Sequence, residues 1–345
     1  MKVFITGGAG FIGCNAAARF IRGGHDVTLY DNLSRPGTAS NLRWLRGLGP
    51  FRLVKGDVRD PRRLGRSVAA VKGLGAVLHY AGQVAVTTSV ADPRTDFEVN
   101  ALGTFNVLEA VRHAGAGLRG RKKTALLFAS TNKVYGGMED ITVVERGGRY
   151  QYRDLPRGIP ENRLLDFHSP YGCSKGAADQ YVRDYARIYG MPTVVFRQSC
   201  IYGTRQFGVE DQGWVAWFTI AATLGKPITI YGDGKQVRDV LWVEDLVDAY
   251  QMAMARLDRT AGQVYNIGGG HRNQMSLLEL LAYLEGFLKR PVPTDFGDWR
   301  PGDQPVFVCD IAKARRDFGW APRTRVKEGV RLLQAWVREN RRLFG

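Results

Sequence analysis

Cysteine, lysine and long apolar runs are all scarce in this chain of 345 residues. Its four cysteines lie far apart and form no CxxC pair, which excludes a zinc ribbon and a disulfide framework. We therefore expect no metal site and a reducing, cytoplasmic compartment. No segment approaches the roughly 18–20 apolar residues that cross a bilayer, and no cleavable signal precedes the first strand-like residues. We therefore expect no membrane association.

Lysine supplies 12 of the 49 basic residues, so arginine dominates a formal net charge of +16. The charge is spread along the chain, with local clusters at 112–123 and 331–342. Nucleic-acid binding would need a concentrated basic face with interleaved aromatic residues or a reading helix, and the sequence has neither. We expect a solvated surface, some arginines that serve an anionic substrate, and no nucleic-acid partner.

Apolar runs and amphipathic stretches alternate over the first two hundred residues. The strand-like runs lack polar alternation, as is typical of strands covered on both faces. We predict strands at 3–6, 27–31, 51–56, 76–80, 125–130 and 193–198. The helices between them are predicted at 11–22, 61–71, 93–114 and 171–189. This alternation predicts an α/β fold with a doubly wound parallel (Rossmann) sheet.

The alternation stops near residue 200, where helical patterns at 214–224, 276–289 and 326–340 are joined by loops rich in glycine and proline. A helix at 243–257 and a buried strand at 263–267 are predicted to return to the sheet. We therefore expect an NAD-binding domain at 1–198 plus 236–268. The remaining residues, 199–235 plus 269–345, would form a smaller, interleaved mixed α/β lobe that binds substrate, with the ligand between the two.

Residues 7–13 read GGAGFIG between a predicted strand and a predicted helix. Glycines there let the backbone approach a pyrophosphate, and the helix N-terminus points at the phosphates. The second strand ends at Asp31, whose carboxylate can accept the adenosine ribose hydroxyls and repels a 2′-phosphate, which favours NAD over NADP. Two alternatives stay open: Asp31 as a turn residue, and Arg35 as a partner for a 2′-phosphate.

The predicted cofactor site extends along the same sheet edge. Asp57, after the third strand, can meet the adenine amino group, and the pair Ala81 and Gly82 after the fourth strand offers a path free of large side chains. The full set is Gly7, Gly10, Phe11, Ile12, Asp31, Asn32, Ser34, Arg35, Asp57, Val58, Ala81, Gly82, Gln83, Asn100, Tyr171 and Lys175.

Tyr171 and Lys175 lie four residues apart, on one face of a predicted helix. A tyrosine in water has a pKa of about 10, so its ionisation at pH 7 costs about 4 kcal/mol. A nearby lysine and a positively charged nicotinamide can lower that cost. A tyrosinate could then take the proton from a sugar hydroxyl while its carbon loses hydride. Thr131, at the end of the fifth strand, can orient that hydroxyl, because strand ends of a parallel sheet converge.

Together, the glycine loop, Thr131, Tyr171 and Lys175 resemble the extended short-chain dehydrogenase/reductase family, which acts on nucleotide sugars. Further landmarks of that family follow: FRQS at 196–199, YGDG at 231–234, VEDL at 243–246, YNIGG at 265–269 and RPGD at 300–303. The resemblance implies that arginines hold the diphosphate and an acid holds the nucleotide ribose. The implied substrate residues are Asn132, Ser199, Gln206, Gln212, Tyr231, Arg238, Arg300 and Asp303.

Within the family, many dehydratases carry an aspartate and a glutamate directly after the threonine. This chain has Asn132 and Lys133 there, and neither can act as the carboxyl acid or base that elimination needs. The strings STNKVYG at 130–136, GQVAVTTS at 82–89, DFHSP at 166–170 and DQGW at 211–214 resemble a narrow group, the CDP-paratose (CDP-tyvelose) 2-epimerases. That resemblance implies inversion at C2 through a transient 2-keto sugar on bound NAD.

Several alternatives stay open. The substrate could be another CDP-hexose, or the enzyme could be a UDP-hexose 4-epimerase. His168 could act as an acid/base or could only orient its loop. A non-catalytic NAD sensor would not need Thr131, Tyr171 and Lys175 together. The resemblance also implies a homo-oligomer, a dimer or tetramer formed through helices such as those at 93–114 and 171–189.

Overall fold

A seven-stranded parallel sheet forms the centre of the computed structural model, which describes residues 1–115, 123–210, 212–300 and 303–344. The strand order is β12-β8-β5-β4-β1-β2-β3, the order of a doubly wound sheet. Its strands are β1 (Lys2–Thr6), β2 (Asp26–Asp31), β3 (Arg52–Lys55), β4 (Leu74–His79), β5 (Ala125–Thr131), β8 (Thr193–Gln198) and β12 (Gln263–Ile267). The predicted fold class is confirmed.

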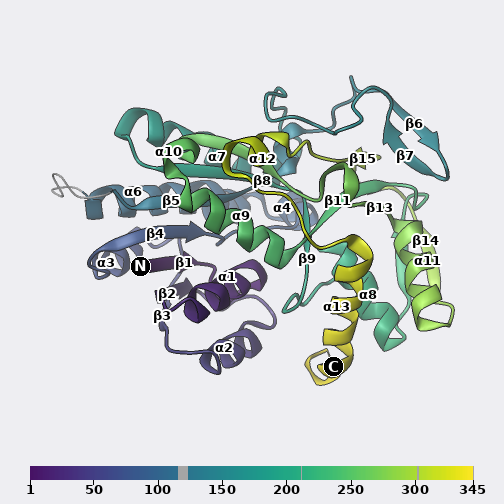
Figure 1. Cartoon of the computed structure of the whole chain (residues 1–345), viewed down its shortest axis with the longest axis horizontal. Helices are drawn as coiled ribbons and strands as arrows, with labels where there is room; N and C mark the ends of the chain where they lie inside the picture. The colour runs from purple at the N-terminus through teal and green to yellow at the C-terminus, as the bar shows by residue number, and fades with distance from the viewer. Residues whose placement is uncertain (116–122, 211, 301–302, 345) are drawn as a thin grey trace.

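Helices cover both faces of this sheet because successive side chains along each strand point to opposite faces. In β1, Val3 and Ile5 pack in one core with α1 (Phe11–Arg22) and α9 (Val243–Ala255). Phe4, between them, packs in a second core with α3 (Pro61–Ala69), α6 (Gly103–Gly115) and α7 (Ser169–Tyr189). Figure 1 shows the layers, with α1 and α9 on one side of the strands. This double burial explains the apolar runs in the sequence.

The helix predicted at 93–114 is interrupted. It consists of α5 (Pro93–Phe97), a π-helical turn at Glu98–Leu102 and α6. Several short elements were not predicted: α2 (Thr38–Arg46), α4 (Val86–Ala91), α10 (Leu257–Thr260), α12 (Ala312–Phe318) and the hairpin of β6 (Val143–Arg146) and β7 (Arg149–Tyr152). The sequence of α4, VTTSVA, has low intrinsic helix propensity, so packing against α7 stabilises it.

The remaining chain builds small sheets and a separate core. β11 (Val237–Trp242) pairs with β9 (Cys200–Tyr202), β13 (Gln274–Ser276) and β15 (Val306–Phe307), and β10 (Ile228–Tyr231) pairs with β14 (Thr294–Gly297). Helices α8 (Trp214–Leu224), α11 (Leu277–Leu288) and α13 (Val326–Glu339) pack over them, and the chain ends beside α8 (Figure 1). Strand β12 belongs to the large sheet, and β11 belongs to a smaller one. The limits given above for the NAD-binding domain and the smaller lobe stay a prediction.

No helix within the described residues is both long enough and apolar enough to cross a membrane. Asp211, Pro301 and Gly302, which belong to motifs noted above, lie outside the described residues.

Candidate active site

The glycine loop joins β1 to α1 in a turn that side chains would block. Gly7 has φ +66°, and a Cβ on it would lie 2.7 Å from the backbone nitrogen of Ala81. A Cβ on Gly13 would lie 2.1 Å from the carbonyl oxygen of Gly7. The first glycine thus lets the loop approach the end of β4, and the last lets α1 pack on the loop. Helix α1 begins at Phe11 and Ile12, directly after this loop, which is the order of elements that the predicted dinucleotide site needs.

The Asp31 carboxylate is buried at the end of β2 and shapes this loop. One oxygen accepts the backbone N–H of Ala9 at 2.9 Å, and the other accepts that of Leu33 at 2.8 Å. Each oxygen keeps a second lone pair, so these bonds are compatible with the predicted ribose contact. They also show that Asp31 serves as a turn residue, one of the alternatives left open above.

Asn32, Ser34 and Asp57 form one polar group beside Asp31. The Asn32 amide donates to Asp57 at 3.0 Å, and the Ser34 hydroxyl donates to Asn32 at 2.7 Å. Hydrogen bonds from Arg59 lower the pKa of Asp57 to about 2, so this carboxylate stays ionised and can accept a donor such as an amino group. Val58, next to it, is buried against Gly103 of α6.

The Arg35 side chain bonds a residue outside this group. Its guanidinium donates to Gln212 at 3.4 Å, and its charge acts on Tyr171. The structure therefore brings Arg35 to the catalytic helix and to a residue predicted to bind substrate. In this conformation it does not contact Asp31 or Asp57 among the described residues.

Asn100 connects the β4 loop to the catalytic helix. Its side-chain oxygen accepts the backbone N–H of Gln83 at 2.9 Å, and its amide donates to Asp96 at 3.0 Å and to Ser174 at 3.2 Å. A Cβ on Gly82 would lie 3.1 Å from Asn100 and 3.9 Å from the Lys175 Nζ. The π-helical turn supplies this placement, and such turns often occur at functional sites. Asp96 and Ser174 were not predicted, because nothing in the local sequence marks them.

Thr131, Tyr171 and Lys175 come together where β5 ends against the first turns of α7. Both Thr131 and Tyr171 are buried, and the Thr131 hydroxyl is close enough to influence the Tyr171 phenol. Burial raises the pKa of Tyr171 to about 12, and the Thr131 side chain opposes part of that shift. Burial lowers the pKa of Lys175 to about 7. The protein alone therefore keeps Tyr171 protonated, and its expected ionisation requires the additional positive charge of a bound nicotinamide.

The Lys175 ammonium is held by residues of β5. It donates to the Ala129 carbonyl and lies 4.2 Å from the ring centroid of Phe128. Beneath it, Asp179 accepts the Ser130 hydroxyl at 2.7 Å and both Nε and Nη2 of Arg197 at 3.0 Å. Asp179 and Arg197 are fully desolvated, and this paired geometry offsets their burial. Sequence reasoning missed this pair, because its members lie on different elements.

The predicted diphosphate residues form a second group. The Arg238 guanidinium makes an ion pair with Asp303, and the Lys133 ammonium lies close enough to be affected by both charges. Burial and the charge of Arg238 lower the pKa of Lys133 to about 8. The Arg300 guanidinium lies 3.9 Å from the ring centroid of Tyr231. Lys133 thus joins the candidate substrate site, a role the sequence alone did not suggest.

Three other residues predicted to bind substrate make hydrogen bonds to other residues of the chain. The Ser199 hydroxyl donates to Asp239, and the Gln206 amide accepts the backbone N–H of Gly203 at 3.2 Å. Asn132 is buried beside Thr131, whose hydroxyl donates to it at 3.4 Å. Asn132 therefore lies at Thr131, whereas Ser199 is bonded to β11 and Gln206 is bonded within its own loop.

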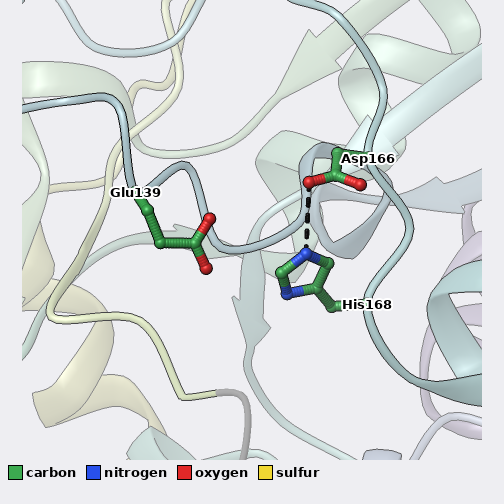
Figure 2. Close-up of side chains that lie close together, drawn as sticks. All are labelled: Glu139, Asp166 and His168. Atoms are coloured by element: carbon green, nitrogen blue, oxygen red, sulfur yellow. Dashed lines mark hydrogen bonds and ion pairs between the residues drawn. The ribbon is translucent and has the colours of Figure 1, made fainter.

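His168 lies with Glu139 and Asp166 in an exposed cluster whose possible ligand atoms are within 4.8 Å of one another. Figure 2 shows the imidazole directed at Asp166, to which Nε2 is hydrogen-bonded at 3.1 Å. This pairing turns the ring toward solvent-exposed carboxylates. It supports an orienting role for His168 over an acid/base role, although the choice between them stays open.

Comparison with known proteins agrees with this geometry. Residues 4–333 match the family model described as GDP-mannose 4,6 dehydratase. The chain belongs to this family. With it, the predicted membership of the extended short-chain dehydrogenase/reductases is confirmed.

Three relatives of this family are informative. The chain is 46% identical to the CDP-paratose 2-epimerase of Salmonella typhi over 98% of this chain and 99% of the relative. UDP-glucose 4-epimerase of Thermotoga maritima, solved with UDP-glucose, is 29% identical with a TM-score of 0.83, covering 98% and 99% of the two chains. dTDP-glucose 4,6-dehydratase of Streptomyces venezuelae, solved with NAD, is 28% identical with a TM-score of 0.83, covering 99% and 98%. The predicted resemblance to the 2-epimerase is thereby confirmed.

Proposed function

We propose that this protein is an NAD-dependent epimerase that inverts C2 of a CDP-linked hexose, of the CDP-paratose to CDP-tyvelose type. The observation that carries the proposal is the pair Asn132 and Lys133 directly after Thr131, at the end of the catalytic strand. The family includes dehydratases, but elimination needs a carboxyl acid and base at this point. The 46% identity to a 2-epimerase supports the same choice.

The cofactor site fits NAD. Gly7 and Gly13 occupy positions where a Cβ would block the loop, and Asp31, Asp57 and Asn100 supply the polar groups around it. Related structures are solved with NAD bound. When bound there, NAD would supply a reversible acceptor for the hydride of the sugar carbon and would not be consumed.

The residues of the chain move the proton and orient the sugar. Tyr171 takes the proton of the reacting hydroxyl and gives it back, while Thr131 holds that hydroxyl in line. Lys175, which is buried at the same place, would contact the cofactor ribose and, in its protonated form, would add positive charge. The ketone must turn over between the two hydride transfers, so binding energy belongs on the nucleotide, away from the reacting carbon.

We propose that the nucleotide is bound by the smaller lobe, 199–235 plus 269–345, together with Arg238 of β11. Guanidinium groups suit a diphosphate because they are planar and permanently charged. Arg238 and Arg300 would hold the diphosphate, Asp303 the ribose, and Tyr231 would lie near the base. Lys133 adds a cation at the same place.

We also propose a cytoplasmic homo-oligomer. Cys14, Cys173, Cys200 and Cys309 are all free, which suits a reducing compartment. Large apolar side chains are exposed along α5, the π-helical turn, α6 and α7, where Phe105 and Tyr181 pack edge to face at 5.9 Å. The exposed set is Phe97, Leu102, Phe105, Tyr181, Ile188 and Tyr189. A patch of this kind on one face marks a protein contact, and a dimer or tetramer would cover it.

The test is NMR of the purified protein with CDP-paratose and, separately, UDP-glucose. We expect inversion at C2 of CDP-paratose without added cofactor, and mass spectrometry of the denatured protein should show retained NAD(H). Inversion at C4 of UDP-glucose, with CDP-paratose untouched, would instead establish the runner-up, a UDP-hexose 4-epimerase. Retention of NADP alone would contradict the assigned role of Asp31 and make Arg35 the determinant of the cofactor.

A further inference from the structure

A cavity of about 810 Å³ lies at the β12 edge of the large sheet, and Thr131, Tyr171 and Lys175 do not line it. Its walls come from the second half of α7, the start of β12, α12 and the loop at 157–162. Arg183, on its wall, lies eight residues beyond Lys175, about 12 Å along the axis of α7. In Figure 1, α12 lies next to α10 at this end of the molecule, and the two helices are in contact.

Positive charge dominates the cavity wall. Six cationic side chains line it, namely Arg157, Arg183, Arg187, Arg197, Lys313 and Arg316, against the two carboxylates Glu161 and Asp310. Three of the cations have carboxylate partners: Arg157 with Asp310, Arg197 with Asp179 and Arg316 with Asp317. One lining carboxylate, Glu161, then remains for the other three cations.

Those three cations are Arg183, Arg187 and Lys313. Lys313 donates to the Gln263 side chain at 3.0 Å and to the Val264 carbonyl at 2.8 Å, both neutral acceptors. Among the residues that the structure describes, Arg183 and Arg187 have no ion pair and no hydrogen bond to a carboxylate. The nearby Glu161 accepts the backbone N–H of Asn266 at 2.9 Å, and its burial raises its pKa.

This arrangement is unfavourable without an anion. Arg183 and Arg187 lie four residues apart on α7, and like charges at this spacing destabilise a helix. Burial and the charges of Arg187 and Arg197 lower the pKa of Arg183, and the charge of Asp179 opposes part of that shift. An anionic ligand at this concave surface would neutralise these charges.

We propose that this cavity binds a phosphorylated small molecule, with its phosphate groups on Arg183, Arg187 and Lys313. Guanidinium groups match phosphate oxygens bidentately and stay charged at any physiological pH. The volume falls within the range of small-molecule sites and far exceeds that of a single inorganic phosphate. Neutral residues, such as Asn162 and Gly262, line the remainder of the cavity wall. We therefore expect the phosphate groups to contribute most of the binding free energy of the ligand.

The site is separate from the apolar face assigned to oligomerisation. Tyr181 and Ile188 lie seven residues apart, on one side of α7, because seven residues complete nearly two turns. At 100° per residue, Arg183 lies about 160° around the same helix from Tyr181, and Arg187 lies about 100° from Ile188. A ligand in the cavity and a second subunit on Tyr181 and Ile188 would therefore contact different sides of α7.

The test compares two double variants with equal charge and equal spacing. R183Q/R187Q removes the cavity cations, and R62Q/R66Q removes an exposed pair four residues apart on α3, which lines no part of the cavity. Isothermal titration of each whole protein with inorganic diphosphate, and separately with CDP, measures affinity and the number of sites. Thermal melting of both variants checks that they remain folded.

We expect R62Q/R66Q to bind like the unmodified protein. R183Q/R187Q should bind one equivalent fewer per chain, or bind that equivalent about tenfold or more weakly, since each lost charge-assisted hydrogen bond contributes at this level. A stronger effect with CDP than with diphosphate would indicate a nucleotide, and an equal effect would indicate that the phosphates suffice. Equal binding of both probes by the two variants would overturn the proposal.

Discussion

Burial shifts the pKa values of Tyr171 and Lys175 in opposite directions, and both shifts favour the neutral side chain. The pKa of Tyr171 rises to about 12 and that of Lys175 falls to about 7. A neutral pair is a suitable resting state, because no charge is left uncompensated in the buried site before ligands arrive. The proton can leave Tyr171 when positive charge enters beside it, which couples proton transfer to the presence of the oxidised cofactor.

Tyr171→Phe should lower turnover by about 10²–10⁴-fold, the range usual for the loss of one proton-transfer group. The ring and its packing remain, so NAD(H) should stay bound and the melting temperature should change little. Single-turnover measurements with the CDP-sugar would show the loss in the chemical step. Near-normal turnover would place the acid/base elsewhere, with His168 as the first candidate.

Lys175 should make stability depend on pH. Its pKa is about 7 in the folded protein and has the ordinary value of 10.5 in the unfolded chain. Between these values the unfolded chain binds more protons, so the free energy of unfolding rises with pH. Lys175→Met removes this contribution. Urea denaturation of cofactor-free protein from pH 7 to 10 should therefore show a steeper rise for the unmodified protein than for the variant, and parallel curves would contradict the assigned burial.

Element boundaries decide how closely the cofactor can approach. The turn between β1 and α1 depends on Gly7 and Gly13, and the π-helical turn places Asn100 against Gln83 and Ser174. Both features bring backbone or amide groups to the edge where the strands end. A doubly wound sheet can form without either feature. We therefore assign both to the cofactor site and not to the hydrophobic core.

Gly13→Ala should therefore remove cofactor binding. Its Cβ would meet the Gly7 carbonyl oxygen at 2.1 Å, a backbone atom that cannot move without displacing the loop from α1. Gly65→Ala, in α3, is the matched control: no atom lies within 4 Å of its Cβ position, and it should stabilise the fold by about 0.5–1 kcal/mol. Mass spectrometry of retained NAD(H) distinguishes the two. Full retention in Gly13→Ala would contradict the assigned role of the loop.

Local spacing made much of this site predictable. The glycine loop, the strand-end residues Asp31 and Thr131, and the pair Tyr171 and Lys175 follow from periodicity over a few residues. Contacts between distant segments were not predictable, such as Arg197 with Asp179 or Lys133 beside Arg238. The π-helical turn was missed because its sequence reads as ordinary helix, and α4 was missed because its sequence disfavours helix. Tertiary packing decides both.

At the scale of the whole molecule, we expect the exposed apolar side chains of α6 and α7 to be buried in a contact between subunits. Ile188 is 66% exposed and should lie in a subunit contact, so Ile188→Glu should convert the oligomer to a monomer. Leu164, 82% exposed on a loop, gives the control variant Leu164→Glu, which should keep the native mass. Sedimentation equilibrium checks both. A monomeric unmodified protein, or an unchanged mass for Ile188→Glu, would contradict the assigned interface.

On the proposed function, the chemistry would occur at one edge of the large sheet, and a separate group of cations would hold the nucleotide. Thr131 and Tyr171 lie at the first, and Arg238 and Lys133 lie at the second. A redox-neutral epimerisation fits this division, because the sugar must turn over while its nucleotide stays fixed.

The most direct test uses a CDP-hexose deuterated at C2. If hydride leaves C2 and returns to C2 within one closed site, the product should be inverted at C2 and keep its deuterium. Unlabelled substrate in D₂O should gain none there. NMR of the product reads both the label and the ring stereochemistry in one spectrum. Solvent deuterium at the inverted carbon would contradict transient oxidation, and inversion at C4 would contradict the proposed 2-epimerase while leaving the fold unaffected.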